Sequence, residues 1–292
     1  MRTAPSPLAA RALAAARLAT LLAVATPALA AVAAAQGPTR GDFDWSEAVR
    51  AGTWLRIRNW NGPVEVRAAS GDRAEVHGQA IGSSDRGTDV VYRVIRDDDG
   101  VTICAVPDRD DIECSARGIN GSGRDWGRRP ARARLLVSLP AGVRIDASSG
   151  NGEVTVENVR ADVVASSGNG RVRVADATGP VQASSGNGDI DVSTATGPVT
   201  ASTGNGRIEA RMLALRDGDM RFSTGNGSVV LWLPDDFGGD VSVSGQRGFD
   251  TDFPIEVRSG NFNSRISGRI GHGSRRVDIS TGNGSVSLRR AR

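Results

Sequence analysis

Lysine is absent from this sequence of 292 residues, so its 36 basic side chains are all arginines. Three of them fall in the first 35 residues, which hold no acidic residue, and the other 33 arginines balance 33 acidic residues. A balanced charge argues against the concentrated basic patch that nucleic-acid binding requires. The missing lysine also excludes a phosphate-binding loop of the form Gly-x-x-x-x-Gly-Lys-Ser/Thr. We therefore expect no nucleic acid among the partners.

Histidine is scarce as well, since only His77 and His272 occur, and no catalytic or metal-binding motif surrounds either. General acid–base or nucleophilic catalysis needs such a group together with positioned partners. Asp189 and Asp191 share one exposed face, but neighbouring arginines favour ion pairs there over a catalytic dyad. We expect a non-catalytic protein with no cofactor and no metal, and a carbohydrate-active β-helix enzyme is the alternative.

Long apolar runs are missing except near the start, where Arg2, Arg11 and Arg17 precede an apolar segment at residues 18–29. Ala-x-Ala sites follow at Ala28/Ala30 and Ala33/Ala35, which is the layout of a secretory signal peptide. We predict a signal peptide at residues 1–35, with cleavage after Ala30 or a retained anchor as alternatives. No later segment is apolar enough to cross a bilayer. The mature chain is then exported to the periplasm, the cell surface or the medium.

Only two cysteines are present, Cys104 and Cys114. An even count in an exported chain predicts one disulfide, which would add on the order of 3 kcal/mol of stability. The spacing does not fit a Cys-x-x-Cys redox pair, and the sequence has no paired histidines for a metal site.

Glycine and β-branched residues are abundant, and they repeat. The tripeptide Gly-Asn-Gly begins at positions 150, 168, 186, 204, 225 and 282. β-Branched residues recur every nine positions at Ile145, Val154, Val163, Val172, Val181, Ile190, Val199 and Ile208. A second apolar residue follows each of them by two positions, which is the period of a strand and excludes a helix.

The second apolar position alternates between alanine and valine, which makes the true repeat 18 residues. The simplest fold with this property is an all-β, single-domain β-solenoid of the β-helix or β-roll kind, in which each 18-residue coil supplies one short strand to each of two sheets. Outward residues Glu153, Arg171, Asp189 and Arg207 alternate in sign at this spacing, which predicts parallel stacking and a solvated ion ladder. Val154, Val172 and Ile190 should then pair on successive coils.

The Gly-Asn-Gly tripeptides are expected at one corner of this solenoid. Their asparagines would form a stacked amide ladder, and their glycines would supply left-handed backbone conformations. The ladder consists of Asn151, Asn169, Asn187 and Asn205, with a second polar column at Ser148, Ser166, Ser184 and Ser202. Calcium is disfavoured because arginines follow alternate corners, where a calcium β-roll needs an aspartate in every turn.

The predicted domain organisation is a signal peptide (1–35), an N-terminal linker (36–51) and a solenoid domain (52–292). Regular repeats occupy residues 143–211, and residues 84–134 insert a hairpin followed by a long polar loop without a clear strand. After residue 211 the solenoid continues with longer turns, and Trp232, Phe237, Phe249 and Phe253 are expected to fill the core and plug its end.

The long loop holds the candidate ligand contacts. An exposed tryptophan among arginines offers a stacking surface and charge to an anionic or sugar partner. These residues are Arg124, Trp126, Arg128 and Arg129. A flexible insertion with no ligand is the alternative.

The signal peptide, the stretch VSLPAGVRID, the repeats SGNGEVTV, SSGNGRVRV and STGNGRIEA, and the closing DISTGNGSVSL resemble a bacterial family of exported domains, the putative-adhesin family of unknown function. The resemblance covers nearly all of the mature chain and implies a short-strand β-solenoid. It implies adhesin-like binding of cell-envelope polysaccharide or a surface protein, with a structural or stress-response envelope scaffold as the alternative. The resemblance does not indicate the oligomeric state.

Overall fold

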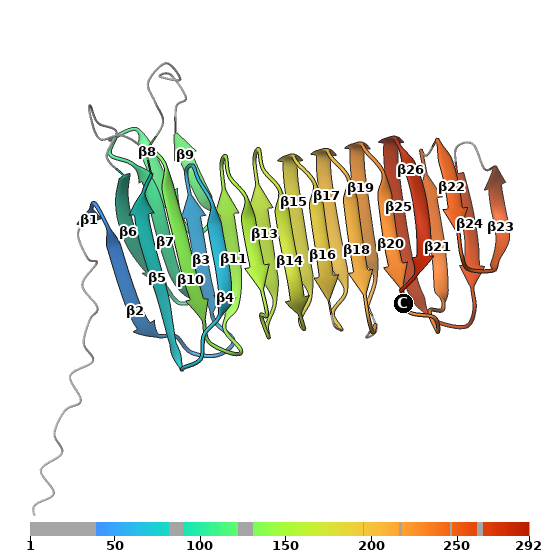
Figure 1. The fold of residues 1–292 in the computed structure, drawn as a ribbon, viewed down its shortest axis with the longest axis horizontal. Coiled ribbons are helices and arrows are strands. Elements are labelled where there is room, and N and C mark those ends of the chain that lie inside the picture. The colour runs from blue at the N-terminus through green and yellow to red at the C-terminus, as the bar shows by residue number, and fades with distance from the viewer. Residues whose placement is uncertain are drawn as a thin grey trace, which may run out of the picture. The chain divides into compact units, whose positions relative to one another are not determined.

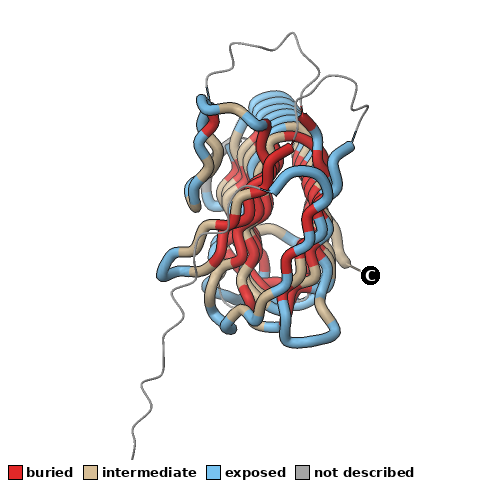
Figure 2. Tube along the Cα trace, turned by 90° about the vertical axis from the view of Figure 1, so that its left-hand side faces the viewer, coloured by how far each residue is buried: buried red, intermediate tan, exposed pale blue. Residues whose placement is uncertain are grey.

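The computed structural model describes residues 39–81, 90–121, 131–194, 196–215, 218–245, 247–261 and 265–291. Its two large β-sheets, here named sheet A and sheet B, face each other across one apolar core (Figures 1 and 2). Within the described residues, a third sheet consists of β8 (Ile112–Ser115) and β9 (Gly118–Gly121). The predicted signal peptide lies outside the described residues.

The strands of sheet A follow one another, in spatial order, as β1 (Thr39–Arg40), β6 (Val90–Asp97), β7 (Gly100–Pro107), β3 (Trp54–Asn59), β11 (Arg144–Ser149), β13 (Val163–Ser167), β15 (Val181–Asn187), β17 (Val199–Asn205), β19 (Met220–Asn226), β25 (Arg275–Asn283), β21 (Gly239–Ser244), β24 (Arg265–Ile270) and β23 (Ile255–Asn261). The strands of sheet B follow as β2 (Phe43–Ala48), β5 (Arg73–Ala80), β10 (Ala133–Leu139), β4 (Val64–Ala68), β12 (Val154–Glu157), β14 (Val172–Ala177), β16 (Ile190–Thr194), β18 (Ile208–Met212), β20 (Val229–Leu233), β26 (Ser285–Arg290) and β22 (Gly248–Thr251).

The predicted 18-residue coil is confirmed. Val154 pairs with Val172, and Val172 pairs with Ile190, along the parallel strands β12, β14 and β16. Sheet A repeats the same register from β11 to β17, so each coil contributes one strand to each sheet. The fold is therefore the all-β solenoid that the repeats predict.

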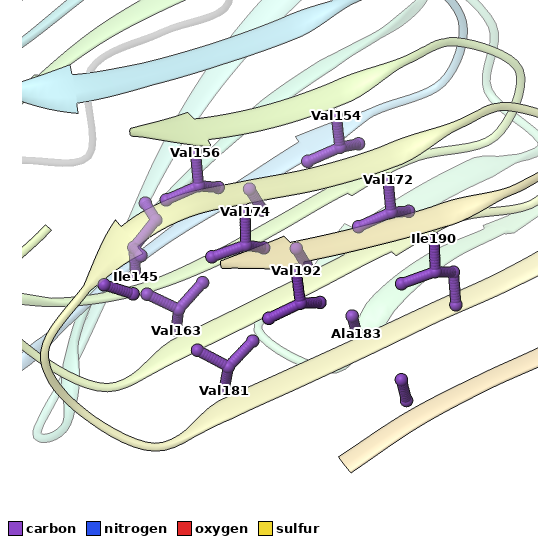
Figure 3. Close-up of a cluster of buried hydrophobic side chains, with 14 of the residues drawn as sticks. Ile145, Val154, Val156, Val163, Val172, Val174, Val181, Ala183, Ile190 and Val192 are labelled. Atoms are coloured by element: carbon purple, nitrogen blue, oxygen red, sulfur yellow. The ribbon is translucent and has the colours of Figure 1, made fainter. Parts of the chain in front are cut away.

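The core lies between the inward positions of the two sheets. Figure 3 shows Val156, Val174 and Val192 of sheet B facing Val163 and Val181 of sheet A. All five side chains are buried, and each buried valine or isoleucine stabilises the fold by about 1.5–3 kcal/mol. The second inward position is alanine on sheet A and mostly valine on sheet B, so small and large side chains share each layer.

The spatial order of the coils differs from their order in the chain. At one end, β7 and β10 stack outside β3 and β4, and the chain then returns to place β11 and β12 on the other side of β3 and β4. At the other end, the last strands, β25 and β26, lie between β19/β20 and β21/β22. The solenoid continues to the C-terminus as expected, in a spatial order that the repeats do not predict.

Both N-terminal expectations outside the repeats also need correction. The expected linker at residues 36–51 contains β1 and β2, which pair antiparallel with β6 and β5. Apolar and polar residues alternate along β2, so one of its faces points to the core. Phe43 and Trp45 lie on that face and are buried. The loop after the predicted hairpin contains a second hairpin, β8–β9.

The described residues contain no helix that is long and apolar enough to span a membrane.

Candidate functional site

The Gly-Asn-Gly corner carries an unbroken amide ladder. From Asn169 onward, each asparagine Nδ2 donates to the Oδ1 of the preceding asparagine in the stack at 2.8 Å. The ladder runs through Asn151, Asn169, Asn187, Asn205, Asn226 and Asn283. Arg247 closes it by donating to Asn283 Oδ1 at 3.0 Å. The side-chain amides hydrogen-bond to one another, so the ladder mainly stabilises the stacking of the coils.

A second, buried ladder stands beside it, and the sequence reasoning did not find it. The inward hydroxyl before each corner donates to the carbonyl oxygen of a corner glycine on the preceding coil at 2.8–2.9 Å. The donors are Ser149, Ser167, Ser185, Thr203, Thr224 and Thr281. Their place directly after the apolar inward positions, at a spacing of two, was the signal that could have revealed it.

The glycines of the corner are required for a different reason from the one expected. The positive-φ glycines of the described residues do not include Gly186 or Gly188. A Cβ on Gly186 would instead lie 2.4 Å from the carbonyl oxygen of Gly168, and one on Gly188 would lie 2.2 Å from that of Gly170. Close stacking of the coils, rather than left-handed backbone, selects glycine here.

The outer face of sheet B is the predicted ion ladder. Arg171 lies 3.5 Å from Asp189 and 3.6 Å from Asp191, and Arg207 lies 2.8 Å from Glu209. Arg171 therefore pairs with both aspartates of the next coil. These charges satisfy one another at the surface, where single ion pairs contribute little to stability.

Trp232 lies on this outer face, which corrects its expected place in the core. Its Nε1 donates to Glu209 at 2.9 Å, and the guanidinium of Arg211 lies 5.2 Å from its ring. Phe237 and Phe253 are buried in the core, as expected, and Phe249 is partly buried and packs against it. Trp232 is thus an outward aromatic side chain that is already engaged by its neighbours.

A shallow hollow of about 430 Å³ opens on the same face over β4 and β12. Thr155 is one of its lining residues. Among the others, Glu65 pairs with Arg134 at 3.4 Å and Glu157 pairs with Arg67 at 3.5 Å. The rim therefore carries both signs of charge, and most of that charge is compensated.

The outer face of sheet A is different in kind. On β13, β15 and β17 the outward side chains are uncharged, and we name this set the neutral face: Val164, Ser166, Gln182, Ser184, Thr200 and Ser202. The ion ladder is therefore confined to the outer face of sheet B in these coils. The expected second polar column, from Ser148 to Ser202, lies on this outer surface, and it continues through Ser223, Ser280 and Ser244.

The β8–β9 hairpin covers one end of sheet A. Cys104 of β7 and Cys114 of β8 are joined by a disulfide. Beneath the hairpin, Arg58 is only 4% exposed, makes paired hydrogen bonds with Asp146 and donates to the carbonyl oxygen of Ala116 at 2.6 Å. The disulfide and this buried arginine fix the hairpin on the sheet.

The other end of sheet A carries a cluster of arginines around one carboxylate. Arg269 donates twice to Asp240, at 3.0 and 3.1 Å, and Arg258 lies 3.3 Å from it. The hydrogen bonds from Arg269 lower the pKa of Asp240 below its usual range. A shallow hollow of about 400 Å³ opens beside the cluster, next to Arg276 and Asp219.

Chemistry-bearing groups do not converge in the described residues. His77 Nδ1 lies 2.5 Å from Asp44 on an exposed surface, and no serine or cysteine among the described residues hydrogen-bonds to its ring. No group of three or more possible metal ligands occurs in the described part of the chain. The predicted ligand contacts Arg124, Trp126, Arg128 and Arg129 lie outside the described residues.

The comparisons with known proteins place the fold. The family model Toastrack DUF4097 matches residues 132–289, and the chain belongs to that family. No curated protein sequence matches the chain.

Solved structures similar to this chain include two bacterial proteins. One is a putative cell adhesion protein from Clostridium sporogenes, with 11% identity and a TM-score of 0.34, and the likeness covers 86% of this chain and 100% of that one. The other is a putative adhesin from Bacteroides fragilis, with 10% identity and a TM-score of 0.33, covering 86% and 98% of the two chains. The family model, rather than these distant likenesses, assigns the chain.

Proposed function

We propose that this chain is an exported, non-catalytic, adhesin-like protein that binds cell-envelope polysaccharide or a surface protein. One observation carries the proposal: the coils stack in one register, so both sheets present long outer faces with side chains at the same positions of successive coils. Such faces suit ligands that are themselves repetitive, because many weak contacts add up along the stack. Residues 1–35 are the proposed signal peptide.

Two alternatives make different demands. A structural or stress-response scaffold would use the same rigid stack without a ligand. A carbohydrate-active β-helix enzyme would need an acid and a base with distinct environments. The carboxylates of sheet B are instead held by arginines, as at Asp189 and Asp191.

The test is a binding assay with the exported protein. Chain purified from the exported fraction should begin at Gln36 and should sediment with washed bacterial envelopes. It should release no reducing ends from a polysaccharide panel. Soluble behaviour in the presence of every envelope fraction would favour the scaffold, and released reducing ends would favour the enzyme.

The loop that holds Trp126 remains a second proposed contact. Removing residues 122–129 keeps β8, β9 and every strand of the two large sheets. If the loop binds the partner, this deletion should lower envelope binding without lowering the unfolding midpoint. Unchanged binding would show that the loop is only an insertion.

A further inference from the structure

On the neutral face of sheet A, the polar side chains are not engaged in hydrogen bonds with other side chains of the described residues. Ser166, Ser184 and Ser202 lie in register on three successive parallel strands. Their hydroxyls, with the side chains of Gln182 and Thr200, make no side-chain hydrogen bond to any other described residue. On sheet B, Arg171, Asp189, Asp191, Arg207 and Glu209 form ion pairs with each other. Among the described coils, sheet A therefore offers the regular array of uncharged donors and acceptors.

The composition of this face decides what kind of partner it can hold. It has no formal charge, while charged pairs border it on both sides, Arg58 with Asp146 and Arg221 with Asp278. It also lacks the tryptophan, tyrosine and arginine anchors that dominate protein–protein interfaces. The side chains of the neutral face are short, so a flat partner can come close to β13, β15 and β17.

The geometry adds a repeat. Serine recurs once per strand, and neighbouring strands are roughly 4.8 Å apart, so hydroxyls line up along the stack. A partner that matches this row must present neutral hydrogen-bonding groups at regular short intervals. An extended polysaccharide has that property along its whole length, whereas the irregular surface of most globular proteins does not.

We propose that the neutral face binds an uncharged, hydroxyl-rich polysaccharide chain lying along the solenoid stack. The proposal rests on the adhesin-like function proposed above and names its surface and partner class. Each hydrogen bond to a hydroxyl exchanges with one to water, so single contacts are weak and binding depends on many of them. Long chains should therefore bind, and short oligosaccharides should not compete with them.

The test compares one substitution on the two sheets. Ser202→Glu places a carboxylate on the neutral face, and Ser193→Glu places the same group on the outer face of β16, opposite Arg211. The probes are an insoluble neutral glucan, an insoluble mannan, polygalacturonate as an anion and chitosan as a cation. A carboxylate under a neutral polymer loses its water without gaining a cation, so Ser202→Glu should weaken glucan or mannan binding by about tenfold or more. Ser193→Glu should leave it unchanged.

A second variant tests the sign of the partner. Thr200→Arg should weaken binding to the neutral polymer as Ser202→Glu does, because either charge is left without a counter-ion. If Thr200→Arg strengthens binding while Ser202→Glu abolishes it, the partner is anionic and the inference is wrong. Thermal unfolding of all three variants verifies that they fold.

The outcomes separate this inference from the function on which it rests. If the wild-type chain sediments with envelopes but binds no neutral polysaccharide, the adhesin-like function stands and the inference falls. If it binds neither, both fall. Equal losses from Ser202→Glu and Ser193→Glu would also overturn the inference, because the neutral face would then have no special part in binding.

Discussion

At the scale of single residues, the space between coils decides which side chains a corner can hold. Gly188→Ala would push a Cβ to 2.2 Å from the carbonyl oxygen of Gly170, at a corner where backbone hydrogen bonds from Asn187 to Gly168 and from Val172 to Asp189 hold the two coils together. We expect a loss of about 1–3 kcal/mol in the free energy of unfolding, which is the usual cost of overpacking. Chemical denaturation measures it. Gly71→Ala is the matched control, because nothing lies within 4 Å of its Cβ position; equal effects of the two substitutions would contradict the steric explanation.

The single tyrosine gives a second prediction at this scale. Tyr92 is 1% exposed, stacks on Phe43, and its hydroxyl has no hydrogen-bond partner among the described residues. Burial, with a smaller contribution from Asp42, raises the pKa of Tyr92 from 10.0 to about 12. The folded state therefore holds the neutral phenol while the unfolded chain ionises.

The sign of the pH effect follows from that shift. The contribution of Tyr92 to stability is complete below pH 10 and is lost as the pH rises from 10 toward 12. Tyrosinate absorbance of the native protein should appear only near the upper end of this range. Tyr92→Phe should remove this part of the alkaline loss and cost little at neutral pH. Ionisation of native Tyr92 near pH 10 would contradict the prediction.

At the scale of elements, the disulfide and the β8–β9 hairpin should behave as one local unit. The hairpin contacts sheet A through its own small apolar cluster, which includes Cys104, Val106 and Ile112 and is separate from the main core. Cys104→Ser with Cys114→Ser should cost on the order of 3 kcal/mol, because the unfolded loop gains freedom. Amide hydrogen exchange should accelerate in β8 and β9 and stay slow in β13–β17. Equal acceleration in the regular coils would show that the hairpin is not a separate unit.

The elements also show how far the sequence could predict this molecule. The nine-residue spacing of β-branched residues defined β11 to β18, since each inward position repeats on the next coil. The β8–β9 hairpin escaped because only Ile112 and Ile119 mark it, and β2 escaped because only Phe43 and Trp45 show its inward alternation. The serine column was visible in the sequence, and the period of two that places Ser149 inward also places Ser148 outward. The neutral face was missed because outward charges were compared along sheet B and not between the two sheets.

At the scale of the whole solenoid, the order of the coils was beyond the reach of the repeat. Every coil offers the same alternation of apolar and polar residues to both of its neighbours. The pattern therefore predicts that coils stack but does not predict which coils are neighbours. Met220 of β19 pairs with Val277 of β25, far along the chain. The intervening strand β21 has the same inward alternation, so the sequence does not exclude pairing of β19 with β21 instead. In the structure, the C-terminal strands β25 and β26 occupy the position between β19/β20 and β21/β22 and connect them.

That arrangement makes the last coil indispensable to its end of the stack. Of the described strands, β21 pairs only with β24 and β25, and β22 pairs only with β26. Arg289 bonds to Asp250 and Asp252 and so holds β22 in place, and hydrogen bonds from Arg289 lower the pKa of Asp252. Without β25 and β26, residues 239–270 lose every pairing that connects them to β19 and β20.

Two deletions of equal length test this dependence. A chain lacking residues 275–292 should expose its β21–β24 amides to rapid hydrogen exchange and should unfold in two steps. A chain lacking residues 181–198 loses one complete 18-residue coil, and Val163 can then pair with Val199 in the same register. That chain should keep β21–β24 protected and unfold in one step. If the C-terminal deletion unfolds in one step with β21–β24 still protected, those strands have restacked on β19 and β20, and the last coil is not needed to hold them.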